Sequence, residues 1–293
     1  MHTWAQWLFY IVFAGQIWLV SRYFPRRQEA RMRHVLETYP PEEFPRLYPR
    51  SRDYYVGSLL AYRWANKAIS ALGVVVLLAL VFVVDHANFA DDGYVSEIWP
   101  LLFAAVQFIP LIALEISACG QYRMMRRLNT ASVRRAPLVP RRLSDFVSPL
   151  TLSVAVVLIV AAVGFDAALN GADHGGIAGA FTRSLGLIFG NGVIAISGAM
   201  MLRGRKPNPH QSAHDRARHI SAALTSSVCV SIALSVFHMA GTLDRAFDLD
   251  YLDATISSLY VVIIASLSIG YLMQKLTLRP SDFEGYRDDP TSA

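Results

Sequence analysis

The chain has 293 residues, of which 54% are hydrophobic and 17% are charged, and its mean hydropathy is +0.35. This composition excludes an ordinary soluble globular protein, in which about 25% of residues are charged. The net charge of +5 does not require a nucleic-acid partner, and we expect none, because the sidedness of a membrane protein accounts for it.

Seven stretches of the chain contain no ionised side chain. Each has about 17 to 26 residues, enough for a helix to cross a hydrocarbon core of roughly 30 Å. The sequence therefore predicts an all-α integral membrane protein, with one bundle of seven transmembrane helices over residues 1–275. The predicted spans cover residues 3–21, 67–85, 98–118, 148–168, 182–202, 219–240 and 254–274.

All but two of the 27 basic residues lie on one side of this bundle, and the exceptions are Arg183 and Arg245. Because basic loops stay in the cytoplasm, we expect the amino terminus outside and the carboxyl terminus inside. A bias of this strength is typical of a bacterial inner membrane. The predicted cytoplasmic segments are the loops 22–63, 121–145 and 203–218 and the tail 276–293.

The first span reads as a retained anchor, since no basic segment precedes it and no small-residue cleavage site follows it. Arginines follow it directly, and a second cluster lies after the third span. These clusters are expected to attract the anionic headgroups of the lipid bilayer. They contain Arg22, Arg26 and Arg27, and Arg126 and Arg127.

The first cytoplasmic loop contains a candidate helix over residues 26–38, followed by a proline-rich segment. Four prolines there exclude a regular helix and favour an extended, polyproline-like conformation. We expect this segment to dock a cytosolic or membrane protein partner. The candidate docking residues are Pro40, Pro41, Phe44, Pro45, Tyr48 and Pro49.

The third span carries Gln107 in its interior and Glu115 near its cytoplasmic end, where an ion pair with Arg123 or a neighbouring arginine is expected. A pattern of proline, a basic residue or Ser, Asp and an aromatic residue recurs at residues 49–54, 136–146 and 279–283. Helix N-caps followed by interfacial aromatic anchors explain it. An ancestral duplication of a two-helix unit is the alternative.

The fifth span places Asn191 between glycines near the middle of the membrane. This pattern is typical either of a broken helix along a substrate path or of a tightly packed helix, and packing is favoured. In the sixth span a polar stripe lies on one helical face, where it either lines a path or bonds the helix backbone. The stripe contains Ser227, Ser231, Ser235 and His238.

Asn208 and Pro209 predict a helix that begins at Pro209 and continues into the sixth span. It would place His210 and His214 one turn apart, as weak candidates for metal ligands. Two imidazoles do not complete a site, so we expect neither metal nor cofactor. At the opposite side, Asp85, His86 and Asp166 are candidates for an ionisable cluster with His238, or are the ordinary polar ends of spans.

The sequence contains none of the phosphate-binding, metalloprotease or serine-hydrolase motifs whose spacing is mechanistic, which argues against an enzyme. The favoured hypothesis is a non-enzymatic sensor, scaffold or accessory subunit that docks a partner through its cytoplasmic loops. The alternative is a small-solute or ion transporter or channel with a polar path through the fifth and sixth spans. A metal-dependent intramembrane hydrolase is a more distant alternative.

Overall fold

The computed structural model describes residues 3–84, 95–129, 142–170, 176–204 and 206–287. These residues form helices joined by turns, and no strand occurs among them. Seven of the helices are long and apolar enough to cross a membrane, which points to a multi-pass membrane protein. The predicted all-α class and the predicted number of candidate spans are therefore confirmed for the described part of the chain.

Several spans are built from more than one helical segment. The first contains α1 (Thr3–Trp18), the π-helix η1 (Leu19–Tyr23) and α2 (Phe24–Thr38); the second contains α3 (Arg52–Ala79) and the π-helix η3 (Leu80–Val84); the third is α5 (Ile98–Leu128); the fourth is α6 (Pro149–Asn170). The short α7 (Gly176–Arg183) precedes the fifth span, α8 (Leu185–Arg203); the sixth is α9 (Ala213–Phe247); the seventh contains α10 (Asp253–Ala265), the π-helix η6 (Ser266–Gly270) and α11 (Tyr271–Lys275).

The helices extend beyond the uncharged stretches that predict them. The second span begins at Arg52, well before the predicted start at residue 67, and α9 extends past both ends of its apolar stretch. Charged side chains at helix ends keep their heads in water while their stems lie along apolar surface, so a charge does not end the helix.

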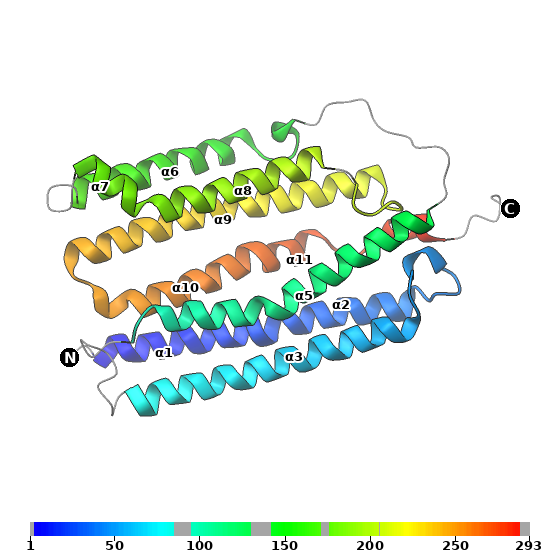
Figure 1. Cartoon of the computed structure of the whole chain (residues 1–293), viewed down its shortest axis with the longest axis horizontal. Helices are drawn as coiled ribbons and strands as arrows, with labels where there is room; N and C mark the ends of the chain where they lie inside the picture. The colour runs from blue at the N-terminus through cyan, green and yellow to red at the C-terminus, as the bar shows by residue number, and fades with distance from the viewer. Residues whose placement is uncertain (1–2, 85–94, 130–141, 171–175, 205, 288–293) are drawn as a thin grey trace.

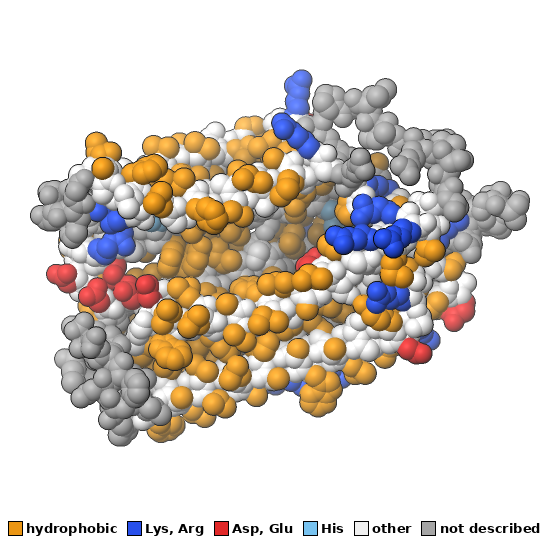
Figure 2. Space-filling view, viewed as in Figure 1, with side chains coloured by type: hydrophobic (Ala, Val, Ile, Leu, Met, Phe, Trp, Pro, Cys, Tyr) orange, Lys and Arg blue, Asp and Glu red, His pale blue; other side chains and the backbone are white. Residues whose placement is uncertain are grey.

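The helices form two groups (Figure 1). In one group α6 and α8 pack against α9, with α7 beside α6; in the other α1, α3 and α5 pack together with α10. Contacts between α9 and α10 join the two groups, and in Figure 2 the surface is hollowed between them. The packing of α9 against α10 thus connects the two groups of helices.

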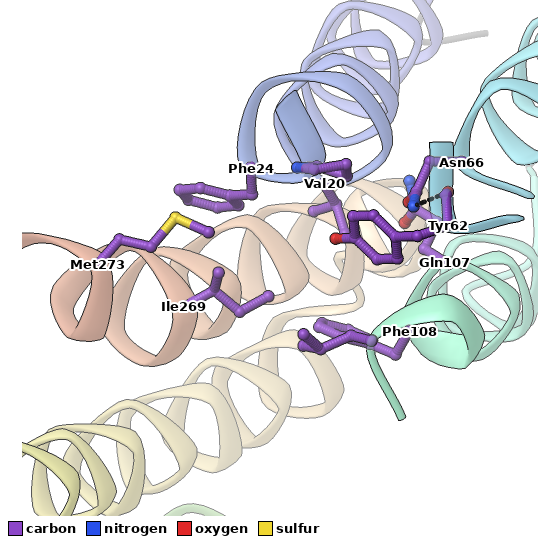
Figure 3. Close-up of a pocket in the computed structure, with 10 residues that line it drawn as sticks. Val20, Phe24, Tyr62, Asn66, Gln107, Phe108, Ile269 and Met273 are labelled. Atoms are coloured by element: carbon purple, nitrogen blue, oxygen red, sulfur yellow. Dashed lines mark hydrogen bonds between the residues drawn. The ribbon is translucent and has the colours of Figure 1, made fainter. Parts of the chain in front are cut away.

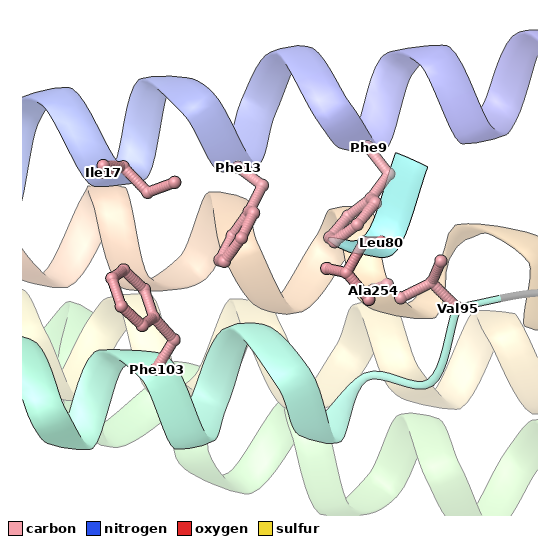
Figure 4. Packing of buried hydrophobic residues seen from close by; sticks show 7 residues of the cluster. All are labelled: Phe9, Phe13, Ile17, Leu80, Val95, Phe103 and Ala254. Carbon is pink, nitrogen blue, oxygen red and sulfur yellow. The ribbon is translucent and has the colours of Figure 1, made fainter. Parts of the chain in front are cut away.

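Aromatic side chains fill the centre of the second group (Figure 4). Phe9, Phe13 and Ile17 lie one turn apart on α1 and meet Phe103 of α5 and Ala254 of α10. The rings of Phe9 and Phe13 stack with centroids 5.4 Å apart, and Phe103 meets Phe13 edge-on at 5.6 Å. In a membrane such van der Waals packing, rather than removal of apolar surface from water, holds helices together.

The two ends of the bundle carry opposite charge. Figure 2 shows most of the Lys and Arg side chains at the end where the carboxyl terminus lies, with some acidic ones among them, whereas acidic side chains gather at the other end beside a few basic ones. We call these the basic end and the acidic end. The short 3₁₀ helices belong to these ends: η2 (Pro45–Leu47), η4 (Leu143–Asp145), η7 (Pro280–Asp282) and η8 (Glu284–Tyr286) at the basic end, and η5 (Asp250–Leu252) at the acidic end.

Two local predictions at the basic end are wrong. The helix of the sixth span begins at Ala213 and not at Pro209, because the Ser212 hydroxyl caps it by accepting from the Asp215 N–H at 3.0 Å. Asn208 instead accepts from the His210 N–H at 3.1 Å and holds a turn.

The proline-rich segment is not extended. The N–H groups of Glu43 and Phe44 bond to the Pro40 carbonyl at 3.2 and 3.0 Å, and η2 follows. The prolines therefore start turns, since their fixed φ suits the first position of a turn or a 3₁₀ helix.

Candidate functional site

Five buried side chains from distant parts of the chain, four of them aromatic, form a compact cluster at the basic end, which we call the aromatic layer. They are Tyr39, Phe44, Met125, Phe283 and Tyr286. The Tyr39 and Phe283 rings stack with centroids 3.8 Å apart, and Phe44 meets Tyr39 edge-on at 5.1 Å. The layer therefore joins the first loop, the end of α5 and the carboxyl-terminal tail.

Backbone and side-chain hydrogen bonds position the loop half of this layer. Tyr39 ends α2, and its N–H donates to the Val35 carbonyl at 3.0 Å. The Tyr48 hydroxyl donates to the Tyr39 carbonyl at 2.6 Å, which closes the proline-rich segment against the helix end. Burial raises the pKa of Tyr48, so the phenol remains a donor at neutral pH.

Charged and polar contacts position the tail half. Asp282 accepts from the Arg279 N–H at 3.1 Å at the start of η7, and it pairs with Arg218 of α9 at 2.7 Å. The hydroxyl of Tyr286 accepts a hydrogen bond from the Asn208 amide, and burial raises the pKa of Tyr286 to about 12. The tail is thus fixed by an ion pair, a buried hydrogen bond and ring stacking.

A glycine permits the closest approach of the tail to the loop before α9. A Cβ atom at Gly285 would lie 2.5 Å from the His210 carbonyl oxygen, a distance at which one of the two segments has to move. His210 itself packs against Tyr286 with ring centroids 5.7 Å apart. The contact between the two segments therefore depends on the absence of a side chain at residue 285.

The predicted docking residues lie in this region. Phe44 is 4% exposed and covered by its own chain, and the Arg287 guanidinium lies over its ring at 5.0 Å. The remaining docking candidates are partly buried: Pro40, Pro41, Pro45, Tyr48 and Pro49. Glu42 and Glu43 are the exposed residues of this segment.

The sequence did not single out Tyr39, Phe283 or Tyr286 as site residues. The recurring pattern at residues 279–283 contains only Phe283 of these three, and the sequence predicts that ring to be an interfacial anchor. Asp282 does cap a short helix as expected, but Phe283 packs inside the protein. The Phe283 ring reaches Tyr39 because the tail begins beside α2, where the Arg31 side chain donates to the Leu276 carbonyl, and sequence spacing does not show this contact.

At the acidic end, the fully buried carboxylate of Asp166 accepts from Arg183 at 2.8 Å, from Asn170 at 3.1 Å and from Arg245 at 3.4 Å. Both basic residues of this end therefore pair with one carboxylate. Thr242 donates to the same carboxylate at 3.4 Å. Such a network satisfies a charge that would otherwise be costly to bury.

His238 lies near this network and is 3.1 Å from the Ser184 hydroxyl. The other two predicted members of the ionisable cluster, Asp85 and His86, lie outside the described residues. Only one group of three possible metal ligands occurs in the described ranges: oxygens of Asp244, Asp250 and Asp253 lie within 4.8 Å of one another. Three carboxylates would suit a hard cation but would leave its coordination incomplete.

The polar stripe of α9 makes its hydrogen bonds inside the bundle. Ser227 and Ser235 donate to carbonyls of their own helix at 2.9 and 3.1 Å, and Ser231 donates to the Asn191 side-chain oxygen. Asn191 donates to the Leu187 carbonyl at 2.9 Å. α8 is continuous through Asn191, and a Cβ at Gly190 would lie 2.8 Å from Leu234 of α9, so the two helices are in close contact.

A second polar network lies in the group around α1. Gln16 donates to Gln107 at 2.9 Å, Ser258 donates to Gln16 at 2.7 Å, and Gln107 donates to Ser21 at 2.9 Å. The network thus links the first, third and seventh spans. Of these residues only Gln107 is named in the sequence analysis; Gln16 is an equally isolated polar residue in an apolar stretch, whereas Ser258 follows Thr255 and Ser257.

A small cavity adjoins Gln107 (Figure 3). Tyr62 and Asn66 of α3 and Phe108 of α5 line it, and the Asn66 amide donates to the Tyr62 carbonyl at 2.8 Å. Its volume of about 10 Å³ is close to that of a single water-sized sphere, too small for a solute.

Two further candidates are placed apart from these networks. Glu115 is exposed and forms no ion pair with any residue of the described ranges, Arg123 included. His210 lies in the turn before α9 while His214 lies exposed in its first turn, so the two imidazoles do not share a helical face.

No protein-family model, no curated protein and no solved structure matches this chain at a significant level.

Proposed function

We propose that this chain is a non-enzymatic component of a bacterial inner membrane, a sensor, scaffold or accessory subunit whose basic end faces the cytoplasm and docks a protein partner. The proposal is supported above all by the aromatic layer, in which the first loop, the end of α5 and the tail fold against one another. A folded layer of this kind presents a defined surface outside the bilayer.

The contacts within the layer offset the conformational entropy that the loop and the tail lose when they adopt one fixed structure. Fixing the backbone of one residue costs about 1 to 2 kcal/mol, so loops without a binding role are commonly left mobile. Here stacking of Tyr39 on Phe283, the Arg218–Asp282 ion pair and the bond between Asn208 and Tyr286 hold the tail in place.

The exposed rim of the layer is where the partner would bind. Glu42 and Glu43 are exposed on the proline-rich segment, whereas the next residue, Phe44, is buried. Prolines on either side reduce the conformational freedom of this segment, which lowers the entropic cost of binding. The partner surface is expected to be basic where it meets the two carboxylates.

The test uses the full chain purified in mild detergent from its own membranes, with bound proteins identified and quantified by mass spectrometry. Glu43→Lys should reduce the amount of co-purified partner several-fold, because it places a like charge opposite the partner's basic surface. Glu97→Lys is the matched control, an equally exposed acidic residue at the acidic end.

The thermal unfolding temperature of both variants should equal that of the wild type. If nothing co-purifies with the wild type, or if both variants lose the partner equally, the docking proposal is wrong.

Transport through the α8–α9 interface is the second candidate. It is supported by the line of polar contacts between these helices, from Asn191 and Ser231 to Ser184 and His238. Asn191→Leu and His238→Ala should then abolish solute flux in proteoliposomes while leaving the unfolding temperature unchanged. Unchanged flux in both variants would assign these contacts to helix packing.

A further inference from the structure

A groove of about 420 Å³ lies between the first span and α3 at the basic end. Arg22 and Arg26 line it from the first span, and Arg63 and Lys67 line it from α3. The members of each pair are four residues apart and so lie on the same face of their helix. Four cations therefore border one groove from two facing helices.

The protein itself neutralises only part of this charge. Glu29, the one acidic residue of the lining, is 3.5 Å from Arg63 and is also paired with Arg33 at 2.7 Å. Arg22 and Arg26 make no hydrogen bond or ion pair with the described part of the chain, and Lys67 lies over the Trp64 ring at 4.5 Å. Like charges one turn apart repel, so the groove favours an anion.

The groove lies where both helices change from charged to uncharged sequence. The uncharged stretch of the first span ends at Ser21, directly before Arg22, and that of α3 begins at Ala68, directly after Lys67. Trp64, which is 64% exposed, is typical of the membrane–water interface. The cationic rim is thus at the depth of lipid phosphates.

Beyond the cations, toward the uncharged part of both helices, the lining is apolar. Ala71 and Val74 continue the α3 wall by one and two turns, and both are exposed. Acyl chains suit such a surface, whereas a free phosphate ion gains nothing from it.

The polar walls are held rigidly. Ser21 lies in the π-helix η1, which directs its buried hydroxyl to Gln107, and Asn66 is bonded to the Tyr62 carbonyl. Single π-turns inside helices are frequent at functional sites, because the extra residue redirects the side chains that follow it. Here the residue that follows Ser21 is Arg22.

We propose that this groove binds one anionic phospholipid, with its phosphate between Arg22 and Arg26 on one side and Arg63 and Lys67 on the other. Its acyl chains lie along Ala71 and Val74. The arginine guanidinium groups match phosphate oxygens in bidentate geometry, and Lys67 supplies a further charge. The site is independent of the partner surface at the aromatic layer.

The test is native mass spectrometry of the full chain in detergent, titrated with phosphatidylglycerol or with phosphatidylcholine. The wild type should retain one molecule of phosphatidylglycerol in preference to phosphatidylcholine. Arg22→Gln with Arg26→Gln should weaken phosphatidylglycerol binding roughly 10- to 30-fold, as expected for the loss of two surface charges. Arg63→Gln with Lys67→Gln should do the same.

Arg123→Gln with Arg203→Gln removes the same charge from exposed positions outside the groove and outside both arginine clusters, and it should leave binding unchanged. Equal weakening in this control would mean unspecific attraction and would overturn the proposal. So would equal binding of the two lipids by the wild type.

Ala71→Phe tests the apolar half, retains every charge and places its ring where the acyl chains would lie. It should weaken phosphatidylglycerol binding even if a charge variant fails to fold, and wild-type binding in this variant would overturn the lipid assignment. Inorganic phosphate in large excess should not displace the lipid; displacement would identify the groove as a site for free phosphate instead.

Discussion

Asp166 is 0% exposed, and its carboxylate is held by two arginines of unequal exposure. Arg183 is largely buried, whereas the side chain of Arg245 is 46% exposed. A buried ion pair adds little stability compared with an apolar pair, but loss of one partner leaves a buried charge uncompensated. Loss of the Arg183–Asp166 pair should therefore lower stability more than loss of the Arg245–Asp166 pair.

Asp166→Asn should lower the free energy of unfolding by about 3 kcal/mol, because the Arg183 charge stays buried without its counter-ion. Denaturant titration in detergent measures this change. Addition of Arg183→Gln should restore part of the loss, whereas Arg245→Gln should restore little. Additive losses in the Asp166→Asn, Arg183→Gln double variant would contradict a direct coupling of the two charges.

The amide network around Gln16 is the second set of buried polar groups. Gln107→Leu should lower the free energy of unfolding by about 1 to 2 kcal/mol, because the Gln16 amide loses one of its two acceptors and keeps only the Pro100 carbonyl, and Ser21 loses its donor. Ser266→Ala is the control, since that exposed hydroxyl donates only to the Val262 carbonyl of its own helix. Equal effects of the two substitutions would show that the interhelical bonds contribute nothing.

At the scale of elements, side-chain contacts with other parts of the chain hold the carboxyl-terminal tail in place. Its two short helices, η7 and η8, bury Phe283 and Tyr286 against the proline-rich segment and the loop before α9. Detachment of the tail would uncover Tyr39 and Phe44.

Gly285→Ala should detach the tail, because the new methyl group would lie 2.5 Å from the His210 carbonyl oxygen. Chymotrypsin should then cleave after Phe283, which is 7% exposed in the docked tail, faster than in the wild type, as followed by mass spectrometry. Gly57→Ala is the control, since a Cβ at Gly57 meets nothing within 4 Å. Unchanged cleavage in Gly285→Ala would mean that the two segments separate without cost.

Docking of the tail should weaken in mild acid. Burial, together with the nearby charges of Arg46 and Lys206, lowers the pKa of His210 from 6.5. Because its pKa is lower in the docked state, His210 takes up a proton more readily when the tail is undocked. Its contribution to the stability of the docked tail is therefore complete above pH 6.5 and is lost as pH falls toward the docked-state pKa.

A spin label at the exposed Ser281, in a chain whose Cys119 and Cys229 are replaced, should become more mobile as pH falls from about 7.5 to about 5.5. The same label in a His210→Gln chain should show no change over this range. A pH response of equal size in both chains would assign the effect to another group.

For the whole molecule, the separation of charge between the two ends predicts its orientation in the membrane. Single cysteines at Thr3 and Ser281 lie at opposite ends of the bundle. In intact spheroplasts a membrane-impermeant thiol reagent should label Thr3→Cys, and it should label Ser281→Cys only after lysis. The opposite result would reverse the proposed orientation and place the aromatic layer outside the cell.

Local sequence accounts for the secondary structure at this scale. Uncharged stretches of membrane-spanning length correspond to seven helices, and the basic helix predicted over residues 26–38 corresponds to α2. The start of α9 was misplaced because two capping residues, Asn208 and Ser212, lie one turn apart, and only the fold shows which of them caps the helix. The polyproline interpretation failed because proline also starts turns.

The sequence by itself determined that the chain crosses a membrane on helices and that its ends carry opposite charge. The first follows from the cost of placing charges in hydrocarbon, and the second from the retention of basic loops on one side of the membrane; both depend on the local sequence alone. Only the tertiary structure decided which residues meet, Phe283 with Tyr39 and both arginines of the acidic end with Asp166, and that Arg22 and Lys67 line one groove. These contacts depend on how helices far apart in the chain pack side by side, and local sequence patterns do not predict that packing.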